Sequence, residues 1–224
     1  MFFDDALVVS KTLELTLTGK DCGLEERAPM CGIPHHSSEI YTKKLIDAGF
    51  KVAICEQLTD PSESKGIVQR DVIRVVTPGT LIESSMLSDD SNNYICCVFY
   101  DKLSCGICFA DISTGEVKLS VSDGKNMEPE LIDLMSRYEP SEIIFNSEFL
   151  SLKSTLNFIK TKLGAVVTLR DSECFNPAEK STAVIRQFSV ESMDELGLSG
   201  DSADVCAVCG LFDYIGDTQK ILTG

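Results

Sequence analysis

The chain has 224 residues, enough for one large domain or two modest ones. Its composition, 43% hydrophobic and 25% charged, is typical of a folded globular protein and excludes a disordered one. The longest apolar run, 94–100, falls far short of the about 20 residues needed to span a bilayer, and the acidic Asp4 and Asp5 do not suit a secretion signal. We therefore expect a cytoplasmic protein that makes no contact with a membrane.

The net charge of −15 argues against a general nucleic-acid binder, because affinity for phosphates comes from Lys and Arg. The charge is unevenly distributed along the chain. Residues 1–80 carry 9 Lys and Arg against 12 Asp and Glu, whereas residues 81–224 carry 11 against 23. If either part contacts DNA, we expect it to be the first.

Residues 1–80 have the pattern of a small mixed α/β domain. The polar and charged segment 20–27 is predicted to be a loop, and Gly49 is predicted to end the second helix. Apolar spacing, caps and alternation predict helices and strands in the following order: a helix over 4–15, a strand over 15–18, a helix over 37–48, and strands over 51–58 and 68–76.

A polar, Ser-rich and acidic stretch suits an exposed linker over residues 81–92, followed by a second domain over 93–224. This second domain is predicted to contain strands over 94–100, 105–111, 116–121, 142–146 and 165–169, and helices over 129–137, 150–163, 178–188 and 202–219. The short loops between the first three strands imply an antiparallel meander. Three such strands followed by alternating helices and strands is the order of an RNase H-like fold.

The ten cysteines lie mostly in apolar stretches, which favours buried thiols in a reducing compartment over disulfides. Two pairs have the spacing of metal ligands. Cys105 and Cys108 fall in a predicted strand, where a separation of three sends side chains to opposite faces. Cys206 and Cys209 fall in a predicted helix, where the same separation also suits a core stripe. No His follows either pair at zinc-finger spacing, so we predict no metal site.

An RNase H-like order raises the alternative of a two-metal nuclease. That chemistry needs several carboxylates that converge on paired Mg²⁺ ions, one of them normally within the first strand. The first strand here, 94–100, contains no acid; Asp101 falls in the following turn and Asp111 at the end of the second strand. The central carboxylate is therefore missing.

Other catalytic signatures are also missing from the sequence. No Gly-x-x-x-x-Gly-Lys-Ser/Thr motif occurs, so the chain has no P-loop, and no Ser or Cys has a clear base partner. His35 and His36 are the only histidines, and adjacent side chains in an extended segment diverge, which disfavours a shared metal. Such a histidine either contacts DNA or holds a loop together. We predict that the chain is not an enzyme and binds no cofactor.

Candidate DNA contacts lie in the first domain. Guanidinium and ammonium groups suit phosphate oxygens, although solvated surface charge explains any single one of them as well. A stiff apolar loop between Pro29 and Pro34 either presses on a minor groove or packs as a turn. The candidates are Lys20, Arg27, Met30, His36, Arg70 and Arg74.

Three motifs identify a family resemblance. They are Ala-Pro-Met-Cys-Gly-Ile-Pro-His-His at 28–36, Ala-Ile-Cys-Glu-Gln at 53–57 and Val-Ile-Arg-Val-Val-Thr-Pro-Gly-Thr at 72–80. In this order they resemble the N-terminal part of the MutS family, the bacterial DNA mismatch-recognition ATPases. Residues 1–80 resemble the mismatch-recognition domain (domain I), and residues from 92 onward resemble the RNase H-like connector (domain II), including its closing segment at 212–220.

The resemblance implies partners and cofactors for the full-length proteins. These are double-stranded mismatched DNA, the partner MutL, a second subunit, the remaining MutS domains, and ATP with Mg²⁺ at an ATPase domain that this chain lacks. It also implies a non-enzymatic connector that contacts MutL, for which we select the helix at 178–188 and its residues Ala183, Arg186 and Gln187.

One departure from the family pattern concerns mismatch selectivity. In the family, an aromatic-x-Glu tripeptide that reads the mismatched base directly precedes a segment like Phe3-Asp4-Asp5-Ala6, so it would lie just upstream of residue 1. We therefore expect a fragment of a mismatch-repair protein whose DNA binding is weak and non-selective. The alternatives are the metal-dependent nuclease and a protein-interaction module with no role on DNA.

Overall fold

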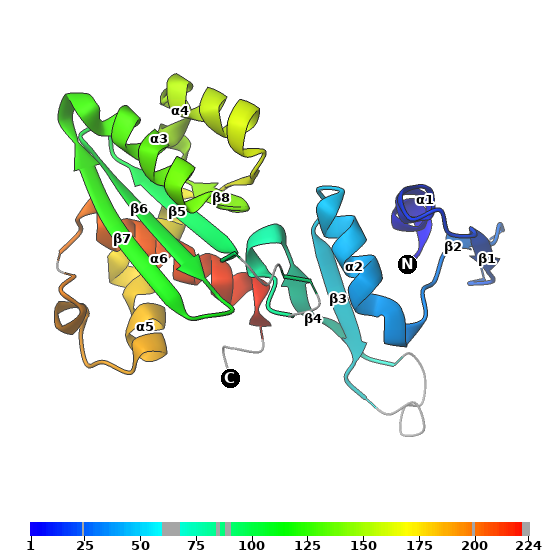
Figure 1. The fold of residues 1–224 in the computed structure, drawn as a ribbon. Helices are drawn as coiled ribbons and strands as arrows, with labels where there is room; N and C mark the ends of the chain where they lie inside the picture. The colour runs from blue at the N-terminus through cyan, green and yellow to red at the C-terminus, as the bar shows by residue number, and fades with distance from the viewer. Residues whose placement is uncertain (24, 60–67, 84–85, 88–90, 199, 221–224) are drawn as a thin grey trace.

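The computed structural model describes residues 1–23, 25–59, 68–83, 86–87, 91–198 and 200–220. Two domains of mixed α/β structure follow each other along the chain (Figure 1). The first contains two separate two-stranded sheets, and the second contains one five-stranded sheet. The predicted fold class, a small α/β domain followed by a larger α/β domain, is confirmed.

The first domain consists of short elements. Its helices are α1 (Phe3–Thr12), η1 (His35–Ser37), α2 (Ser38–Asp47) and η2 (Pro78–Thr80), and its strands are β1 (Thr18–Lys20), β2 (Ala28–Met30), β3 (Val52–Gln57) and β4 (Arg70–Val76). Strand β1 pairs antiparallel with β2, and β3 pairs antiparallel with β4. Ala6 and Val9 of α1 are buried with Cys31 and with Leu45 of α2 in a small core.

Three predictions for this domain were wrong in detail. The helix predicted over 4–15 is α1, which already ends at Thr12. The strand predicted over 15–18 lies instead at Thr18–Lys20, because α1 ends at Thr12 and the chain turns through Glu14, whose φ is 55°. Strand β2 was not predicted. It contains Pro29, which lacks a backbone N–H and so hides the strand pattern, although an edge position tolerates it.

The second domain has the element order that the sequence predicts. Its strands are β5 (Tyr94–Tyr100), β6 (Ser104–Asp111), β7 (Glu116–Asp123), β8 (Glu142–Phe145) and β9 (Val166–Leu169). Its helices are η3 (Gly124–Asn126), α3 (Met127–Tyr138), η4 (Ser147–Ser151), α4 (Lys153–Phe158), the π-helical η5 (Ile159–Leu163), η6 (Ser172–Phe175), α5 (Pro177–Phe188), η7 (Met193–Leu196) and α6 (Ala203–Thr218).

The strand order in the sheet is β7-β6-β5-β8-β9. Strands β5, β6 and β7 form an antiparallel meander, whereas β8 and β9 join in parallel on the other side of β5. This is the RNase H-like order that the sequence predicts, with the first three strands antiparallel and the last two added by crossover helices.

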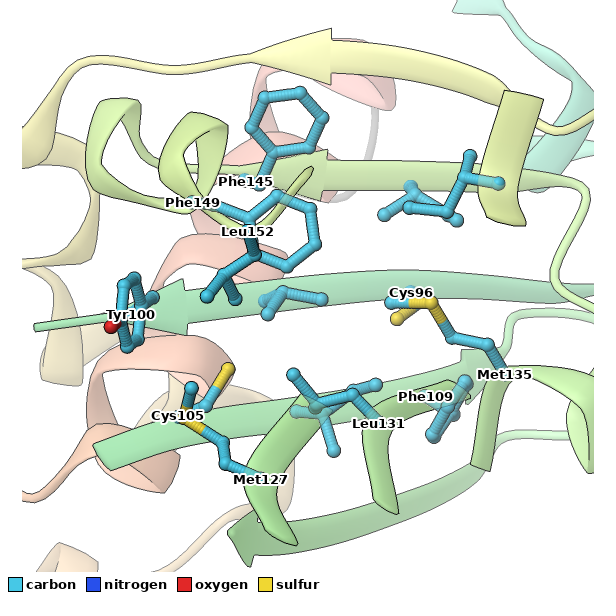
Figure 2. Close-up of a cluster of buried hydrophobic side chains, with 14 of the residues drawn as sticks. Cys96, Tyr100, Cys105, Phe109, Met127, Leu131, Met135, Phe145, Phe149 and Leu152 are labelled. Atoms are coloured by element: carbon cyan, nitrogen blue, oxygen red, sulfur yellow. The ribbon is translucent and has the colours of Figure 1, made fainter. Parts of the chain in front are cut away.

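Helices cover both faces of this sheet, with α3 and α4 on one side and α5 and α6 on the other (Figure 1). Because successive side chains of a strand point to opposite faces, β5 contributes to two cores. Cys96 and Val98 join the core under α3 and α4, whereas Ile95 and Cys97 join the core under α6. Figure 2 shows the core under α3 and α4, with Cys96 labelled. Among the described residues, no helix has both the length and the apolar character to cross a membrane.

Candidate nucleic-acid interface

Two of the predicted DNA contacts, Lys20 and Arg27, lie on the β1–β2 hairpin. Lys20 is opposite Ala28 in the strand pairing, and Arg27 directly precedes β2. The Cβ of Arg27 lies 3.1 Å from the position that a Cβ on Gly19 would occupy, so the Arg27 side chain packs along β1. Both cations are exposed, and the Lys20 ammonium lies 5.7 Å from the centre of the Phe2 ring. The hairpin therefore places two cations on one short element.

Met30 and His36 lie on the segment that leads from this hairpin into α2. Met30 is half-buried and forms an antiparallel bridge with Phe2, while the neighbouring Cys31 is buried. His36 is exposed in the single turn that precedes α2. Ile33, the other apolar residue of the loop, is half-buried.

Arg70 and Arg74 both lie on β4 but have different surroundings. Arg70 is exposed at the start of the strand, where its guanidinium donates a hydrogen bond of 2.8 Å to Gln57 Oε1. The Arg74 guanidinium pairs with the Glu83 carboxylate and donates a 3.0 Å hydrogen bond to the Thr80 carbonyl. The charge of Arg74 is therefore paired with a carboxylate within the fold, whereas the described partner of the exposed Arg70 is the neutral amide of Gln57.

The ion pair with Arg74 changes the pKa of the Glu83 carboxyl. Burial alone would raise the pKa of its carboxyl, but the hydrogen bond and charge of Arg74 outweigh burial and lower the pKa below its usual value. The Arg74 side chain is only 12% exposed. The structure thus separates Arg74 from Lys20, Arg27 and Arg70, the three candidates whose charges face solvent.

The predicted partner-binding residues occupy one face of α5. Ala183, Arg186 and Gln187 follow each other at helical spacing and are all exposed, while Val184 between them is buried. Beside this face lies a cavity of about 120 Å³ between the end of α5 and α6, and its lining includes Gln187, Phe188, Phe212 and Ile215.

Ion pairs attach both α5 and the residue after β9 to α6. Lys180 of α5 lies 2.8 Å from Asp213 of α6, and Arg170 lies 2.7 Å from Asp213 and 2.6 Å from Asp217. Burial would raise the pKa of Asp213, but the hydrogen bonds from Lys180 and Arg170 outweigh burial and lower the pKa. The ion pair between Lys180 and Asp213 therefore helps to hold α5, with its exposed face, against α6.

The acids considered for a nuclease do not converge. Asp101 follows the end of β5, whereas Asp111 ends β6 opposite Tyr94, at the start of β5. Each caps a turn: Asp101 Oδ1 accepts the N–H of Leu103 at 2.8 Å, and Asp111 Oδ1 accepts the N–H of Ser113 at 2.9 Å. Within the described residues, no three His, Cys, Asp or Glu side chains gather in a way that could hold a metal ion.

The two cysteine pairs lie where their spacing predicts. Cys105 belongs to the core under α3 and α4, and Cys108 belongs to the core under α6, so their side chains point to opposite faces of the sheet. Cys206 and Cys209 both belong to the core under α6. The spacing in each pair is explained by packing.

The sequence prediction missed one polar centre, Glu142. It begins a strand whose other three residues are apolar, and its side chain is fully buried at the boundary between the two domains. The sequence signal that could have identified it is an acid at the start of a strand that is otherwise apolar. A charge buried in such a strand requires partners. Those partners come from distant parts of the chain.

Comparison with known proteins assigns both domains. The family model for MutS domain I matches residues 1–85, and the family model for MutS domain II matches residues 93–223. Three relatives share the name DNA mismatch repair protein MutS. The relative from Alkaliphilus oremlandii is 43% identical over 98% of this chain and 25% of its own length. The relative from Acetivibrio thermocellus is 41% identical over 99% of this chain and 25% of its own length. The relative from Clostridium botulinum is 55% identical over 64% of this chain and 15% of its own length.

The chain spans about a quarter of the length of the first two of these relatives. Their similarity to this chain extends across both domains. The two family models follow one another in the same order as the two domains of the structure. The chain therefore belongs to the MutS family.

Proposed function

We propose that this chain is the part of a DNA mismatch-repair protein that contacts duplex DNA through its first domain and a MutL partner through its second. The observation that carries the proposal is the pair of matches to MutS domains I and II over residues 1–85 and 93–223. Its role is binding and signalling rather than catalysis. It acts in the cytoplasm, as part of a protein with a second subunit and with further domains that use ATP and Mg²⁺.

The exposed cations of the first domain support the DNA contact. Lys20 and Arg27 share the β1–β2 hairpin, and Arg70 is exposed at one end of the β3–β4 ribbon. Since the whole chain carries a charge of −15, any attraction to phosphates must come from such local groups. Met30 and His36 lie on the segment next to the hairpin and complete the proposed surface. Arg74 is left out because Glu83 already neutralises its charge.

The proposed DNA binding is weak and does not select a mismatch. The 224 residues contain no aromatic-x-Glu tripeptide, the family's reader of the mismatched base. An aromatic side chain stacked on a base contributes about 1–3 kcal/mol, whereas bending a duplex costs on the order of several kcal/mol. Without the stacking contribution, the cost of the bend is offset less.

For the partner, the exposed face of α5 is the proposed contact. Ala183, Arg186 and Gln187 offer a small residue, a cation and an amide side by side, and Gln187 also borders the cavity next to α6. A polar rim around an apolar hollow is the usual anatomy of a protein–protein contact. MutL is the partner that the family resemblance implies.

Charge removal from the hairpin tests the DNA contact. In fluorescence-anisotropy titrations with a labelled duplex at low salt, we expect Lys20→Ala/Arg27→Ala to weaken binding. The slope of log K against log salt should fall by about 2, since each lost phosphate contact contributes about 0.9. The matched control is Lys160→Ala/Lys162→Ala, which removes two exposed cations from η5 in the second domain. An equal loss in both variants would show that only net charge matters.

A binding assay with purified MutL tests the partner contact. We expect Arg186→Glu/Gln187→Ala to abolish binding that wild type retains at high salt. The control is Arg137→Glu on the exposed side of α3, across the sheet from α5. If wild type binds MutL but no DNA at low salt, the chain is an interaction module without a role on DNA. If both variants bind MutL as well as wild type does, α5 is not the contact.

A further inference from the structure

Glu142 holds a fully buried carboxylate that five donors surround. Its Oε1 forms an ion pair with Lys51 Nζ at 3.0 Å and accepts hydrogen bonds from the Tyr214 hydroxyl at 2.6 Å and from the Thr168 hydroxyl at 3.3 Å. Its Oε2 accepts hydrogen bonds from the Thr77 hydroxyl and from the Gly79 N–H, the latter at 3.3 Å. Both carboxylate oxygens are therefore satisfied, as a buried charge requires.

The donors come from both domains. Glu142, Thr168 and Tyr214 belong to β8, β9 and α6 of the second domain. Lys51 directly precedes β3, and Thr77 and Gly79 follow β4, so three of the five donors come from the first domain. The carboxylate is thus provided by one domain and held largely by the other.

Lys51 reaches further into the second domain than this single ion pair. Its ammonium also donates hydrogen bonds of 2.8 Å to the Thr168 hydroxyl and of 2.8 Å to the Tyr214 hydroxyl. It lies 5.2 Å from the centre of the Tyr214 ring, a distance at which a cation is attracted to an aromatic face. All three of its described partners belong to the second domain.

The backbone around Gly79 packs tightly against the second domain. A Cβ at this position would lie 2.8 Å from Ile95 Cβ and 3.0 Å from Glu142 Cβ, so only glycine fits. The Thr77 and Thr80 side chains form a capping box that fixes this turn, and Asn93 Nδ2 donates a 2.8 Å hydrogen bond to the Pro78 carbonyl. The turn that carries the Thr77 and Gly79 donors is therefore fixed both by its own capping box and by contacts with the second domain.

We propose that Glu142, Lys51 and Thr77 form an ionic joint around a buried carboxylate, and that this joint fixes the two domains as one rigid body. If the domains separated, Glu142 would keep only its two donors from the second domain, and the Lys51 ammonium would lose all the partners described above. Substitution of Lys51 with the domains still in contact would leave the Glu142 charge buried without its cation, which is strongly destabilising. Glu142 is fully buried and the Lys51 side chain is 35% exposed, so salt screens this partly buried pair less than it screens a surface ion pair.

Rotational tumbling of the whole 224-residue chain tests the joint. In ¹⁵N relaxation measurements, amides of both domains of wild type should report one shared correlation time, at low and at high salt. In Lys51→Met/Thr77→Val, which alters only the first domain, we expect loss of the shared value, with a shorter correlation time for the first domain. The control is Lys11→Met, the same change on the exposed side of α1, which lies at the far end of the molecule from the second domain (Figure 1).

Several outcomes would overturn the joint. The joint is contradicted if the two domains still share one correlation time in the double variant, or if Lys11→Met loses the shared correlation time to the same extent. It is also contradicted if the two domains of wild type tumble separately. Unchanged amide shifts in β6 and β7 show that the second domain is still folded. If the double variant does not fold, Glu142→Gln, which keeps the size of the side chain but removes its charge, serves as the second variant with the same expected loss. No nucleic acid enters the measurement, so its result is independent of the proposed DNA contact.

Discussion

At the scale of single residues, the ten cysteines differ in burial, and burial disfavours the thiolate. Cys22 and Cys55 are exposed, Cys174 is half-buried and the other seven are buried. Burial raises the pKa of Cys105 to about 12 and that of Cys209 to about 12. The thiolate is the reactive form, so these buried groups should be inert at neutral pH.

We therefore predict that alkylation of the folded chain at pH 8 modifies Cys22 and Cys55 first. Peptide mapping by mass spectrometry after short exposure to iodoacetamide measures the order of labelling. Denatured chain, in which all ten thiols react, is the control. Early labelling of Cys105 or Cys209 would show that the core around β6 and α6 opens readily.

The second residue-scale prediction concerns Asp213, whose pKa is lowered from 3.8 in the folded chain. A lowered carboxyl pKa stabilises the fold at neutral pH, and this stabilisation is lost as the pH falls below about 4 toward the folded-state pKa. Asp213→Asn should therefore lower the free energy of unfolding by about 2 kcal/mol at pH 7, the scale of hydrogen bonds to charged groups. The difference from wild type should shrink as the pH approaches 3.

Urea unfolding at several pH values measures this difference. Asp133→Asn is the control, because its ion pair with Arg137 on α3 is exposed and contributes little. A gap between wild type and Asp213→Asn that is the same at pH 7 and pH 3 would contradict the assigned role of Lys180 and Arg170.

At the scale of elements, the sequence predicts the second domain better than the first. Long apolar strands such as Tyr94–Tyr100 and amphipathic helices such as α5 have clear periodicity, and the meander follows from the short loops. In the first domain, β3 and β4 are long enough to be predicted, but β1 and β2 have only three residues each, and β2 includes a proline. Strands of three residues are too short to show a periodic pattern in the sequence. Their pairing depends on contacts with other parts of the chain.

Helix α6 gives the sharpest test of element packing. A Cβ on Gly106 of β6 would lie 1.9 Å from the Ala203 carbonyl oxygen, because the start of α6 contacts this strand through its backbone. We predict that Gly106→Ala lowers the free energy of unfolding by about 3 kcal/mol, at the upper end of the range for overpacking. Thermal and urea unfolding measure the change.

Gly32→Ala is the matched control for this substitution. A Cβ on Gly32 would meet nothing within 4 Å, and the substitution should therefore change stability very little. If Gly106→Ala is as stable as Gly32→Ala, α6 does not pack on β6 as closely as described.

At the scale of the whole molecule, the candidate site could be predicted only in part. Lys20, Arg27 and Arg70 are exposed as their polar surroundings indicate, but the pairing of Arg74 with Glu83 depends on how the chain after β4 turns back. Glu142 is hydrogen-bonded to Thr77 and Tyr214, which lie 65 and 72 residues away in the sequence. Contacts over such separations leave no local pattern, so the joint between the domains becomes visible only in the fold.

The central claim is that the first domain contacts duplex DNA without selecting a mismatch. Competition titrations with two duplexes of the same sequence, one fully matched and one with a single G·T pair, test it most directly. We predict measurable binding at low salt that disappears at high salt, with equal affinities for the two duplexes. A clear preference for the mismatched duplex, or no binding to either one at low salt, would contradict the claim.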